Sequence, residues 1–276
     1  MNKESMFRIG SFNIRYQNED DIGLTSWVVR KNKVLELIRF HDIDIIGLQE
    51  VLKDQLIFLK NGLKGYDYVG VGREDGEEEG EFGPIFFKKD KFILEDWGVF
   101  WLSETPEVKG SMGWDAACIR IVTWAKFKVI KTGDSFYFFN THLDHVGKEA
   151  MEQGTYLLLD NIKNIANKFP VLLTGDFNNT PNSEVYKILT RKSENFVKDS
   201  RYMSINEHYG CDFSFHNFKI LEIFENIQKG LINDFPLIDY IFIKNNVKVI
   251  NHAILPDNWN GVYPSDHMPV IIDIEL

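Results

Sequence analysis

Residues 171–178 read Val171-Leu172-Leu173-Thr174-Gly175-Asp176-Phe177-Asn178, an apolar run that passes directly into polar residues. Short apolar runs that end near a glycine are typical of buried β-strands. Residues two positions apart in an extended segment point to the same side, so Asp176 and Asn178 are expected to share one side of the chain. The stretch therefore predicts a strand that delivers a carboxylate and an amide from one end.

The same pattern recurs along the chain. Apolar runs at 7–12, 43–48 and 136–139 each lead into polar residues, and residues 239–243 and 268–272 read as further strands. The polar residues collected at these strand ends are Asn13, Glu50, Asn140, His142, Asp176, Asn178, Asp239, Asp266 and His267. Several strands that deliver polar groups from one end predict the rim of an active site.

Helices are predicted between these strands. Residues 27–40 and residues 151–169 place apolar side chains at helical steps. A third helix is predicted to start at Thr180, with Pro181 in the first turn, where its missing N–H has no consequence. Helices between short strands predict an α+β fold of mixed sheets covered by helices. Residues 73–81 are acidic and rich in glycine, which predicts a loop.

The composition is that of an ordinary globular protein of 276 residues, 44% hydrophobic and 26% charged. Disordered, collagen-like and coiled-coil structures are therefore excluded. Neither an internal repeat nor a Pro- or Ser-rich linker interrupts the chain, so residues 1–276 are predicted to form a single domain. Cys118 and Cys211 lie far apart without C-x-x-C spacing, and reduced thiols are expected.

The charge and the apolar runs bear on location and partners. The chain has 31 Lys and Arg against 41 Asp and Glu, a net charge of −10, which disfavours tight nonspecific binding of polyanions. It has no apolar run long enough to span a membrane, and residues 1–6 lack the apolar segment of a signal peptide. A cytoplasmic protein without a membrane span is expected.

Several common active-site motifs are absent from the sequence. Gly70-Val71-Gly72 lacks the third glycine of a dinucleotide loop, and there is no phosphate loop, H-E-x-x-H or G-x-S-x-G. Ser265-Asp266-His267 contains the letters of a hydrolase triad, but adjacent residues cannot line up as nucleophile, base and acid. The carboxylates and amides at the strand ends instead suit a hard cation such as Mg²⁺ or Mn²⁺.

The polar strand ends belong to six motifs: Ser11-Phe12-Asn13-Ile14-Arg15, Ile46-Gly47-Leu48-Gln49-Glu50, Asn140-Thr141-His142-Leu143, Thr174-Gly175-Asp176-Phe177-Asn178, Ile238-Asp239-Tyr240-Ile241 and Ser265-Asp266-His267-Met268-Pro269-Val270. In this order the motifs resemble those of the endonuclease/exonuclease/phosphatase superfamily. Together they span residues 7–272. The resemblance implies a DNase I-like, four-layer α/β/β/α sandwich of two mixed β-sheets flanked by helices. It also implies metal-dependent hydrolysis of phosphoesters at the top of the sandwich.

The resemblance implies a role for each acidic and amide residue. Glu50 matches the principal metal-binding glutamate of the family, and Asn13 and Asp266 match positions beside the ion. The expected cofactor is Mg²⁺ or Mn²⁺. Asp176 matches the aspartate that orients or deprotonates the attacking water. Asn178 matches the asparagine that hydrogen-bonds the phosphate or the nucleophile.

The resemblance also implies a role for two histidines. His142 and His267 match the pair that donates to the non-bridging phosphate oxygens, where negative charge is held in the transition state. An imidazole that must keep its orientation needs a carboxylate on its other nitrogen. Asp239 matches that partner for His267, and Glu81 aligns with a glutamate that pairs with the middle histidine, here His142.

The expected substrate contacts complete the site. Arg120 matches a basic phosphate contact of some family members, and Asn140 is also expected to bind the substrate phosphate. Asp144 and His145 follow the strand that carries His142, where they could contact a leaving group or merely cap a loop, and the sequence leaves this choice open. Trp259 stands among loop-forming residues before the last motif, which gives the hypothesis of a substrate-facing loop.

The predicted function is Mg²⁺- or Mn²⁺-dependent hydrolysis of phosphoester bonds, by a phosphodiesterase, nuclease or phosphatase. The acidic balance favours a soluble small phosphoester or a short nucleic acid over long duplex DNA. The choice between diester and monoester, and between one and two metal ions, stays open, and no protein partner is inferred. The alternative is a catalytically silent binding member of the same fold, although every expected acid, amide and imidazole is present.

Overall fold

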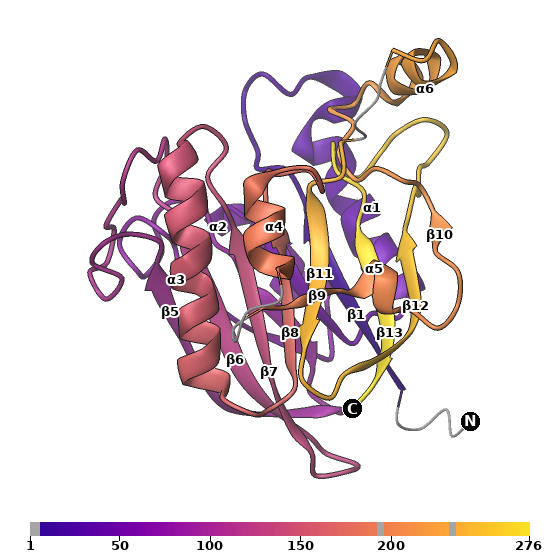
Figure 1. The fold of residues 1–276 in the computed structure, drawn as a ribbon. Helices are drawn as coiled ribbons and strands as arrows, with labels where there is room; N and C mark the ends of the chain where they lie inside the picture. The colour runs from indigo at the N-terminus through magenta and orange to yellow at the C-terminus, as the bar shows by residue number, and fades with distance from the viewer. Residues whose placement is uncertain (1–5, 192–195, 232–235) are drawn as a thin grey trace.

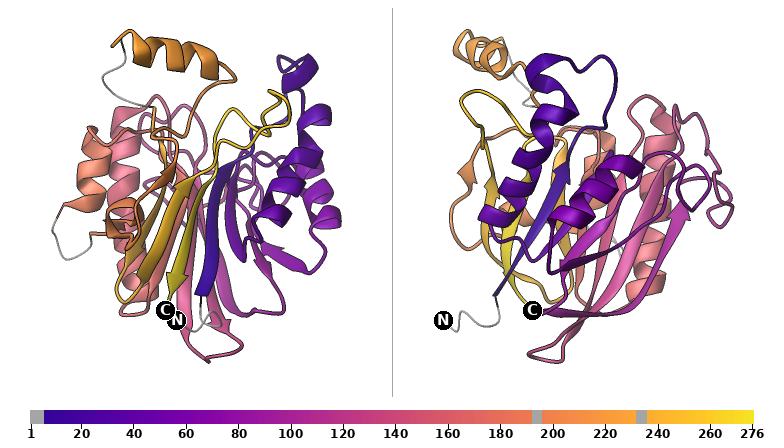
Figure 2. Two further views of the ribbon diagram at one scale, coloured as in Figure 1. Left: turned by 90° about the vertical axis from the view of Figure 1, so that its right-hand side faces the viewer. Right: turned by 180° about the vertical axis from the view of Figure 1, so that it is seen from behind.

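The computed structural model describes residues 6–191, 196–231 and 236–276. In these ranges two β-sheets pack face to face (Figure 1). Helices cover the outer side of each sheet, as the two further views in Figure 2 show. Each sheet combines parallel and antiparallel neighbours. The predicted α+β fold, a four-layer α/β/β/α sandwich of two mixed β-sheets, is confirmed.

The strands fall into a seven-stranded and a six-stranded sheet. The first sheet has the order β10 (Tyr209–Gly210), β12 (Lys248–Ile254), β13 (Val270–Glu275), β1 (Met6–Asn13), β2 (Ile45–Gln49), β4 (Ile85–Lys88) and β3 (Tyr66–Val69). The second has the order β5 (Phe92–Trp101), β6 (Ile121–Val129), β7 (Ser135–His142), β8 (Val171–Asp176), β11 (Asp239–Lys244) and β9 (Lys198–Asp199).

The helices lie in the connections between strands. In chain order they are the 3₁₀ helix η2 (Gly23–Thr25), α1 (Trp27–Phe40), α2 (Lys53–Gly62), α3 (Lys148–Ala166), α4 (Glu184–Thr190), α5 (Ser200–Met203) and α6 (Ile220–Gln228). Helices α1 and α2 cover the seven-stranded sheet, and α3 and α4 cover the six-stranded sheet (Figure 2). The acidic segment 73–81 forms a loop, as predicted.

Buried apolar side chains form two clusters. One lies between the sheets and continues under α3 and α4, with Ile9, Phe138 and Ile162 among its fully buried members. The other lies between the seven-stranded sheet and the helices α1 and α2, and contains Ile38 and Leu59. Each sheet therefore has two covered faces, which explains why its central strands are apolar with little alternation.

The direction of the strands brings the polar strand ends together. β1 is parallel to β2, and β7 is parallel to β8, so their carboxyl ends point to the same edge, at the top of Figure 1. β11 is antiparallel to β8 and begins at this edge, where Asp239 lies opposite Asp176. The segment before β13 reaches the same edge because β13 is antiparallel to β1.

The two sheets are in close contact where β2 packs against β7 and β8. Gly47 has no side chain there, and a Cβ at this position would collide with the side chains of Thr174 and Asn140. Asn140 is fully buried and donates from Nδ2 to the carbonyl oxygen of Leu48 over 2.7 Å. Its Oδ1 accepts hydrogen bonds from Gln49 Nε2 (2.7 Å) and Thr174 Oγ1 (3.0 Å). One amide thus ties both sheets together.

Two helices begin at residues other than the predicted ones. The helix predicted to start at Thr180 begins at Glu184, because the Ser183 hydroxyl caps it by accepting a hydrogen bond from Tyr186 N over 3.1 Å. Pro181 therefore lies in the preceding turn. The helix predicted over 151–169 spans Lys148–Ala166 and ends before Asn167, whose φ of 49° is not helical.

Within the three described ranges, no helix combines the length and the apolar character needed to cross a bilayer. Residues 1–5, which contribute to the prediction that a signal peptide is absent, lie outside the described residues.

Replacing Gly47 by alanine should lower the free energy of unfolding by about 3 kcal/mol, because the added methyl group overpacks the contact between the sheets. The matched control is Gly154→Ala in α3, where the new Cβ meets its nearest neighbour, Leu102, at 3.7 Å. Alanine is the better helix former there, so the control should be neutral or stabilising by up to about 1 kcal/mol. Urea unfolding of both variants measures the difference, and equal stability would contradict the role of Gly47.

Candidate functional site

A cavity of about 550 Å³ opens at the edge where the polar strand ends meet. Its lining contains most of the residues predicted from the sequence: Glu50, Glu81, Arg120, His142, Asp176, Asn178, Asp266 and His267. It also contains residues to which the sequence assigned no role: Arg15, Tyr16, Arg73, Cys118, Phe215 and Ile238. His145, whose role the sequence left open, is part of the wall as well. The size suits a small ligand.

Asn13 joins acidic groups from the two sheets. It ends β1 and is fully buried. Its Nδ2 donates to Glu50 Oε1 over 3.0 Å and to Asp176 Oδ2 over 2.9 Å. The second oxygen of Glu50 accepts from the backbone N–H of Tyr16 over 3.0 Å. The carboxylates after β2 and at the end of β8 are thereby held in fixed positions.

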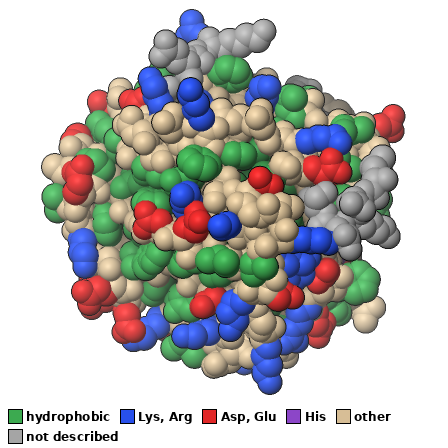
Figure 3. All heavy atoms as spheres, turned by 90° about the horizontal axis from the view of Figure 1, so that it is seen from below, with side chains coloured by type: hydrophobic (Ala, Val, Ile, Leu, Met, Phe, Trp, Pro, Cys, Tyr) green, Lys and Arg blue, Asp and Glu red, His purple; other side chains and the backbone are tan. Residues whose placement is uncertain are grey.

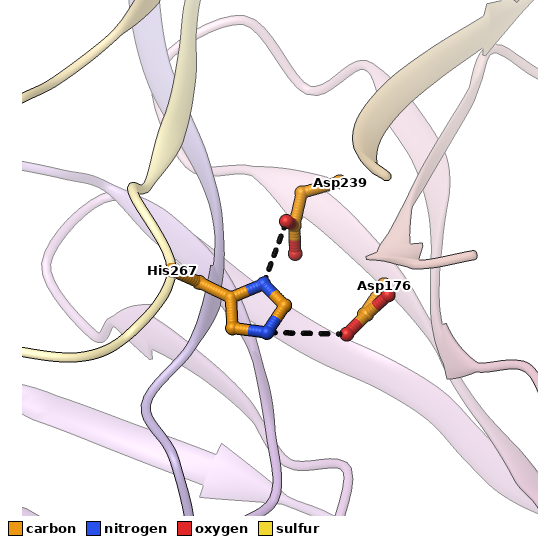
Figure 4. A group of neighbouring side chains, drawn as sticks. All are labelled: Asp176, Asp239 and His267. Atoms are coloured by element: carbon orange, nitrogen blue, oxygen red, sulfur yellow. Dashed lines mark hydrogen bonds and ion pairs between the residues drawn. The ribbon is translucent and has the colours of Figure 1, made fainter. Parts of the chain in front are cut away.

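His267 lies between two buried carboxylates (Figure 4). Its Nδ1 is 2.8 Å from Asp239 Oδ2, and its Nε2 is 3.7 Å from Asp176 Oδ2. Burial alone would disfavour a charged imidazole, but Asp239 and Asp176 outweigh it and raise the pKa of His267 to about 10. The imidazole of His267 is therefore a cation at neutral pH.

In Asp176, unlike His267, the effects that favour the neutral form are the stronger ones. Burial and the nearby Asp239 raise its pKa to about 7, although His267 and the hydrogen bond from Asn13 favour the ionised form. A carboxyl group whose pKa lies near neutrality is suited to accept a proton. Asn178, two residues later in the chain, holds this carboxyl group in place, because its backbone N–H donates to Asp176 Oδ1 over 2.9 Å.

His142 faces the same carboxylate but stays neutral. Its Nε2 is 3.5 Å from Asp176 Oδ2. Burial, with Arg120 and His267 nearby, holds its pKa well below the usual value. Its Nδ1 is buried and has no hydrogen-bond partner among the described residues.

The predicted pairing of Glu81 with His142 is not found. Glu81 Oε2 instead pairs with Arg73 Nη1 over 2.8 Å, and burial raises the pKa of Glu81. The reason is local: Arg73 N donates to the carbonyl oxygen of Glu81 over 3.1 Å, so the loop folds back and places the two side chains together. Glu81 still lines the cavity beside His142.

The geometry corrects the prediction that Asn140 binds the substrate phosphate. Its amide is fully buried, does not line the cavity, and is used by the hydrogen bonds that join the two sheets. Trp259 does not line the cavity either. It pairs with Val262 in a tight turn and packs against the core cluster beneath α1 and α2, so the hypothesis of a substrate-facing tryptophan is not supported.

Asp144 and His145 have different roles, which the sequence alone left undecided. Asp144 is buried and accepts hydrogen bonds from the backbone N–H groups of Ala117, Val146 and Gly147, so it fixes the loop. It also lies 3.5 Å from Arg120 Nε. His145 reaches the cavity, and its Nδ1 is 2.9 Å from Arg120 Nη2.

Two cavity arginines were missed by sequence reasoning. Arg15 pairs with Asp21 through Nε and Nη2, and its Nη1 lies 3.2 Å from Asp266 Oδ2. Arg15 lies two residues after the predicted site residue Asn13, and this position could have indicated that it reaches the same cavity. Arg73 gave no such signal, because it opens a loop whose composition is acidic. Its carbonyl oxygen accepts a hydrogen bond from Trp101 Nε1 over 2.7 Å, which anchors the loop.

Three of the ten non-glycine residues with positive φ in the described ranges line the cavity. Glu50, Asn178 and Arg15 have φ values of 61°, 51° and 59°, in the left-handed region that side chains other than glycine rarely adopt. Such residues persist only where the surrounding structure enforces them, and they occur preferentially at functional sites. The strain supports the assignment of this cavity as the functional site.

The acidic groups offer two possible sets of metal ligands. Asp176, Asp239 and His267 bring ligand atoms within 4.8 Å of one another, but these three groups already pair with each other in the interior. Glu50 and Asp266 line the cavity, with Asn13 behind them. Carboxylate and amide oxygens are the donors that hard divalent cations prefer. Glu50 and Asp266 therefore offer carboxylate oxygens to a divalent ion from the cavity wall, beside Arg15, whose Nη1 lies 3.2 Å from Asp266 Oδ2.

The chain has relatives of similar sequence and fold. The profile of the endonuclease/exonuclease/phosphatase family matches residues 10–267. The crystal structure of an endonuclease/exonuclease/phosphatase from Bacteroides vulgatus is 42% identical, with a TM-score of 0.89 over 98% of this chain and 99% of that one. A mannosyl-6-phosphatase from Bacteroides thetaiotaomicron is 35% identical, with a TM-score of 0.87 over 98% of this chain and 100% of that one.

A more distant relative has a different substrate in its name. The CCR4-Not complex 3'-5'-exoribonuclease subunit Ccr4 of Aspergillus niger is 25% identical over 91% of this chain. The match covers 48% of that protein, so the chain spans about half its length. Family profile, full-length structural match and motif order agree. The chain therefore belongs to the endonuclease/exonuclease/phosphatase family.

Proposed function

We propose that the protein is a phosphoester hydrolase that depends on a divalent cation, Mg²⁺ or Mn²⁺. The observation that carries this proposal is the environment of Asp176. Its Oδ2 lies 3.5 Å from Nε2 of His142 and 3.7 Å from Nε2 of His267 and accepts a hydrogen bond from Asn13. A proton acceptor and two imidazoles thus face one small cavity, as water-mediated attack on a phosphoryl group requires.

Asp176 accepts the proton of the attacking water in this proposal. Asn13 and the backbone of Asn178 hold its carboxylate in place. The cationic imidazole of His267 and the neutral imidazole of His142 bind the phosphoryl oxygens, where charge concentrates in the transition state. Asp239 orients His267 through its 2.8 Å contact with Nδ1.

Glu50, Asn13 and Asp266 are the proposed ligands of the cation. When bound, a divalent cation neutralises negative charge on the phosphoryl group and on the departing oxygen. Asn178 has a second amide hydrogen besides the one that Nδ2 donates to the carbonyl oxygen of Leu143, so it can also contact the phosphate. Arg120 remains a proposed phosphate contact from the cavity wall.

A small phosphomonoester is the favoured substrate class. The mannosyl-6-phosphatase matches this chain over its full length at 35% identity, whereas the exoribonuclease subunit matches over half its length at 25%. The cavity of about 550 Å³ holds a small ester. Figure 3 shows the face opposite the site, where basic side chains lie among acidic ones, and the proposed substrate contacts lie on the other face. A short RNA end is the second candidate substrate.

Two expectations about the chain as a whole stay predictions. These are a single domain over residues 1–276 and a cytoplasmic location. The alternative of a catalytically silent binding member has no supporting observation, because the proposed base, both imidazoles and the acidic ligands meet at one cavity.

Hydrolysis of p-nitrophenyl phosphate and of bis(p-nitrophenyl) phosphate tests the reaction. With Mg²⁺ or Mn²⁺ the protein should cleave the monoester faster, and EDTA should abolish turnover. Asp176→Ala should lower kcat by at least about 10²-fold, because the water loses its proton acceptor. Preferred cleavage of the diester would redirect the proposal to a phosphodiesterase, and turnover that survives in Asp176→Ala would refute the assigned base.

Thermal unfolding without substrate tests the cation site. At a hundredfold excess over its Kd, a divalent ion stabilises the folded state by about 2.7 kcal/mol, so Mg²⁺ or Mn²⁺ should raise Tm by several degrees. Glu50→Gln should remove this shift, whereas Glu107→Gln, a change of an exposed carboxylate, should keep it. If Asp239→Asn removes the shift and Glu50→Gln does not, the ion binds in the buried group around His267 instead.

A further inference from the structure

His145 stands on the cavity wall in a protonation state that its neighbour determines. Its Nδ1 lies 2.9 Å from Nη2 of Arg120. A guanidinium group has N–H donors and no acceptor, so Arg120 donates this hydrogen bond and Nδ1 of His145 accepts it. An imidazole whose Nδ1 accepts is neutral and carries its hydrogen on Nε2. His145 therefore presents one N–H donor from its Nε2.

Arg120 and Asp144 hold His145 in a fixed position. Arg120 is 5% exposed, and its Nε lies 3.5 Å from Asp144 Oδ1. Asp144 also binds backbone N–H groups on both sides of the contact, at Ala117 and Cys118 and at Val146 and Gly147. The imidazole itself is exposed at the cavity. A donor held in this way loses little freedom when it binds a partner.

The charge on this part of the wall is balanced. The positive charge of Arg120 is compensated by the buried carboxylate of Asp144, and His145 is neutral. A second phosphate group would favour uncompensated positive charge, because charge-assisted hydrogen bonds are the stronger ones. The Nη2 and Nε of Arg120 are occupied by His145 and Asp144, so the Nε2–H of His145 is a donor that this part of the wall offers, and a hydroxyl oxygen is an acceptor that it can bind without a charge of its own.

Of the groups proposed to bind the reacting phosphate, Arg120 contacts His145 through its Nη2. His142, His267 and Asp176 converge on one point of the cavity, whereas His145 belongs to the loop after β7. We propose that His145 is a specificity-determining residue that donates its Nε2–H to a hydroxyl group of a polyhydroxylated leaving group. This inference rests on the proposed phosphoester hydrolysis and names its substrate class: phosphate esters of sugars or related polyols.

Steady-state kinetics on esters that share the phosphate and differ in the leaving group test the inference. Mannose 6-phosphate, glucose 6-phosphate and glycerol 3-phosphate carry hydroxyl groups, and phenyl phosphate carries none. His145→Ala should raise KM about tenfold for the preferred polyol ester, the effect of one lost hydrogen bond, with kcat within about twofold. Its kcat/KM for phenyl phosphate should change less than twofold.

Two further variants separate recognition from structure. His145→Gln places an amide N–H near the position of Nε2 and should recover part of the lost KM. Val146→Ala changes the neighbouring exposed side chain, which does not line the cavity, and should leave both substrates unaffected. Equal losses on phenyl phosphate and on the polyol esters would overturn the inference, and so would a His145→Ala variant with unchanged KM on all of them.

Binding distinguishes a failure of this inference from a failure of the proposed function. Asp176→Asn protein is titrated calorimetrically with mannose 6-phosphate and with phenyl phosphate, with and without His145→Ala. About tenfold weaker binding of the sugar phosphate alone supports His145 as the hydroxyl contact, even if the wild type hydrolyses neither ester. Tighter or equal binding of phenyl phosphate overturns it, whatever the wild-type turnover.

Discussion

The close contact of the two sheets at Gly47 is the constraint on which the rest of the structure depends. Without a side chain at that position, β2 lies directly against β7 and β8, and the amide of Asn140 joins the strands. The carboxyl ends of β1, β2, β7 and β8 then meet at one edge. At this edge Glu50 from one sheet and Asp176 from the other both accept hydrogen bonds from a single asparagine, Asn13.

The interior of the site is stable because its charges compensate one another. Burial disfavours the charge of every group there, yet His267 between Asp239 and Asp176 has a raised pKa and remains a cation. Burial and the nearby Asp239 raise the pKa of Asp176 to about 7, so its carboxyl group ionises as the pH rises through neutrality. The same low-dielectric surroundings that strengthen the His267–Asp239 contact make the loss of either partner costly. Burial thus determines the protonation states of these side chains as much as their residue types do.

Strand ends carry a local signal, an apolar run followed by a polar residue, and this signal predicted mixed sheets with polar groups gathered at one end. The four-layer sandwich and the residue roles were implied by the family resemblance. That signal does not distinguish Asn140, which stabilises the interior, from Asp176, which faces the cavity, since both follow buried strands. Arg73 and the partner of Glu81 depend on how one loop folds back, which no local pattern encodes. The start of α4 was misplaced because Ser183 caps it in place of the residue before Pro181.

The left-handed backbone of Glu50, Asn178 and Arg15 sets activity and stability against each other. Glycine at these positions would release the strain and remove the functional side chain in the same step. Selection for stability alone would therefore favour sequences that fold well and do no chemistry. The left-handed backbone at Glu50, Asn178 and Arg15 is therefore a conformational cost that the chain bears in order to present a carboxylate, an amide and a guanidinium to the cavity.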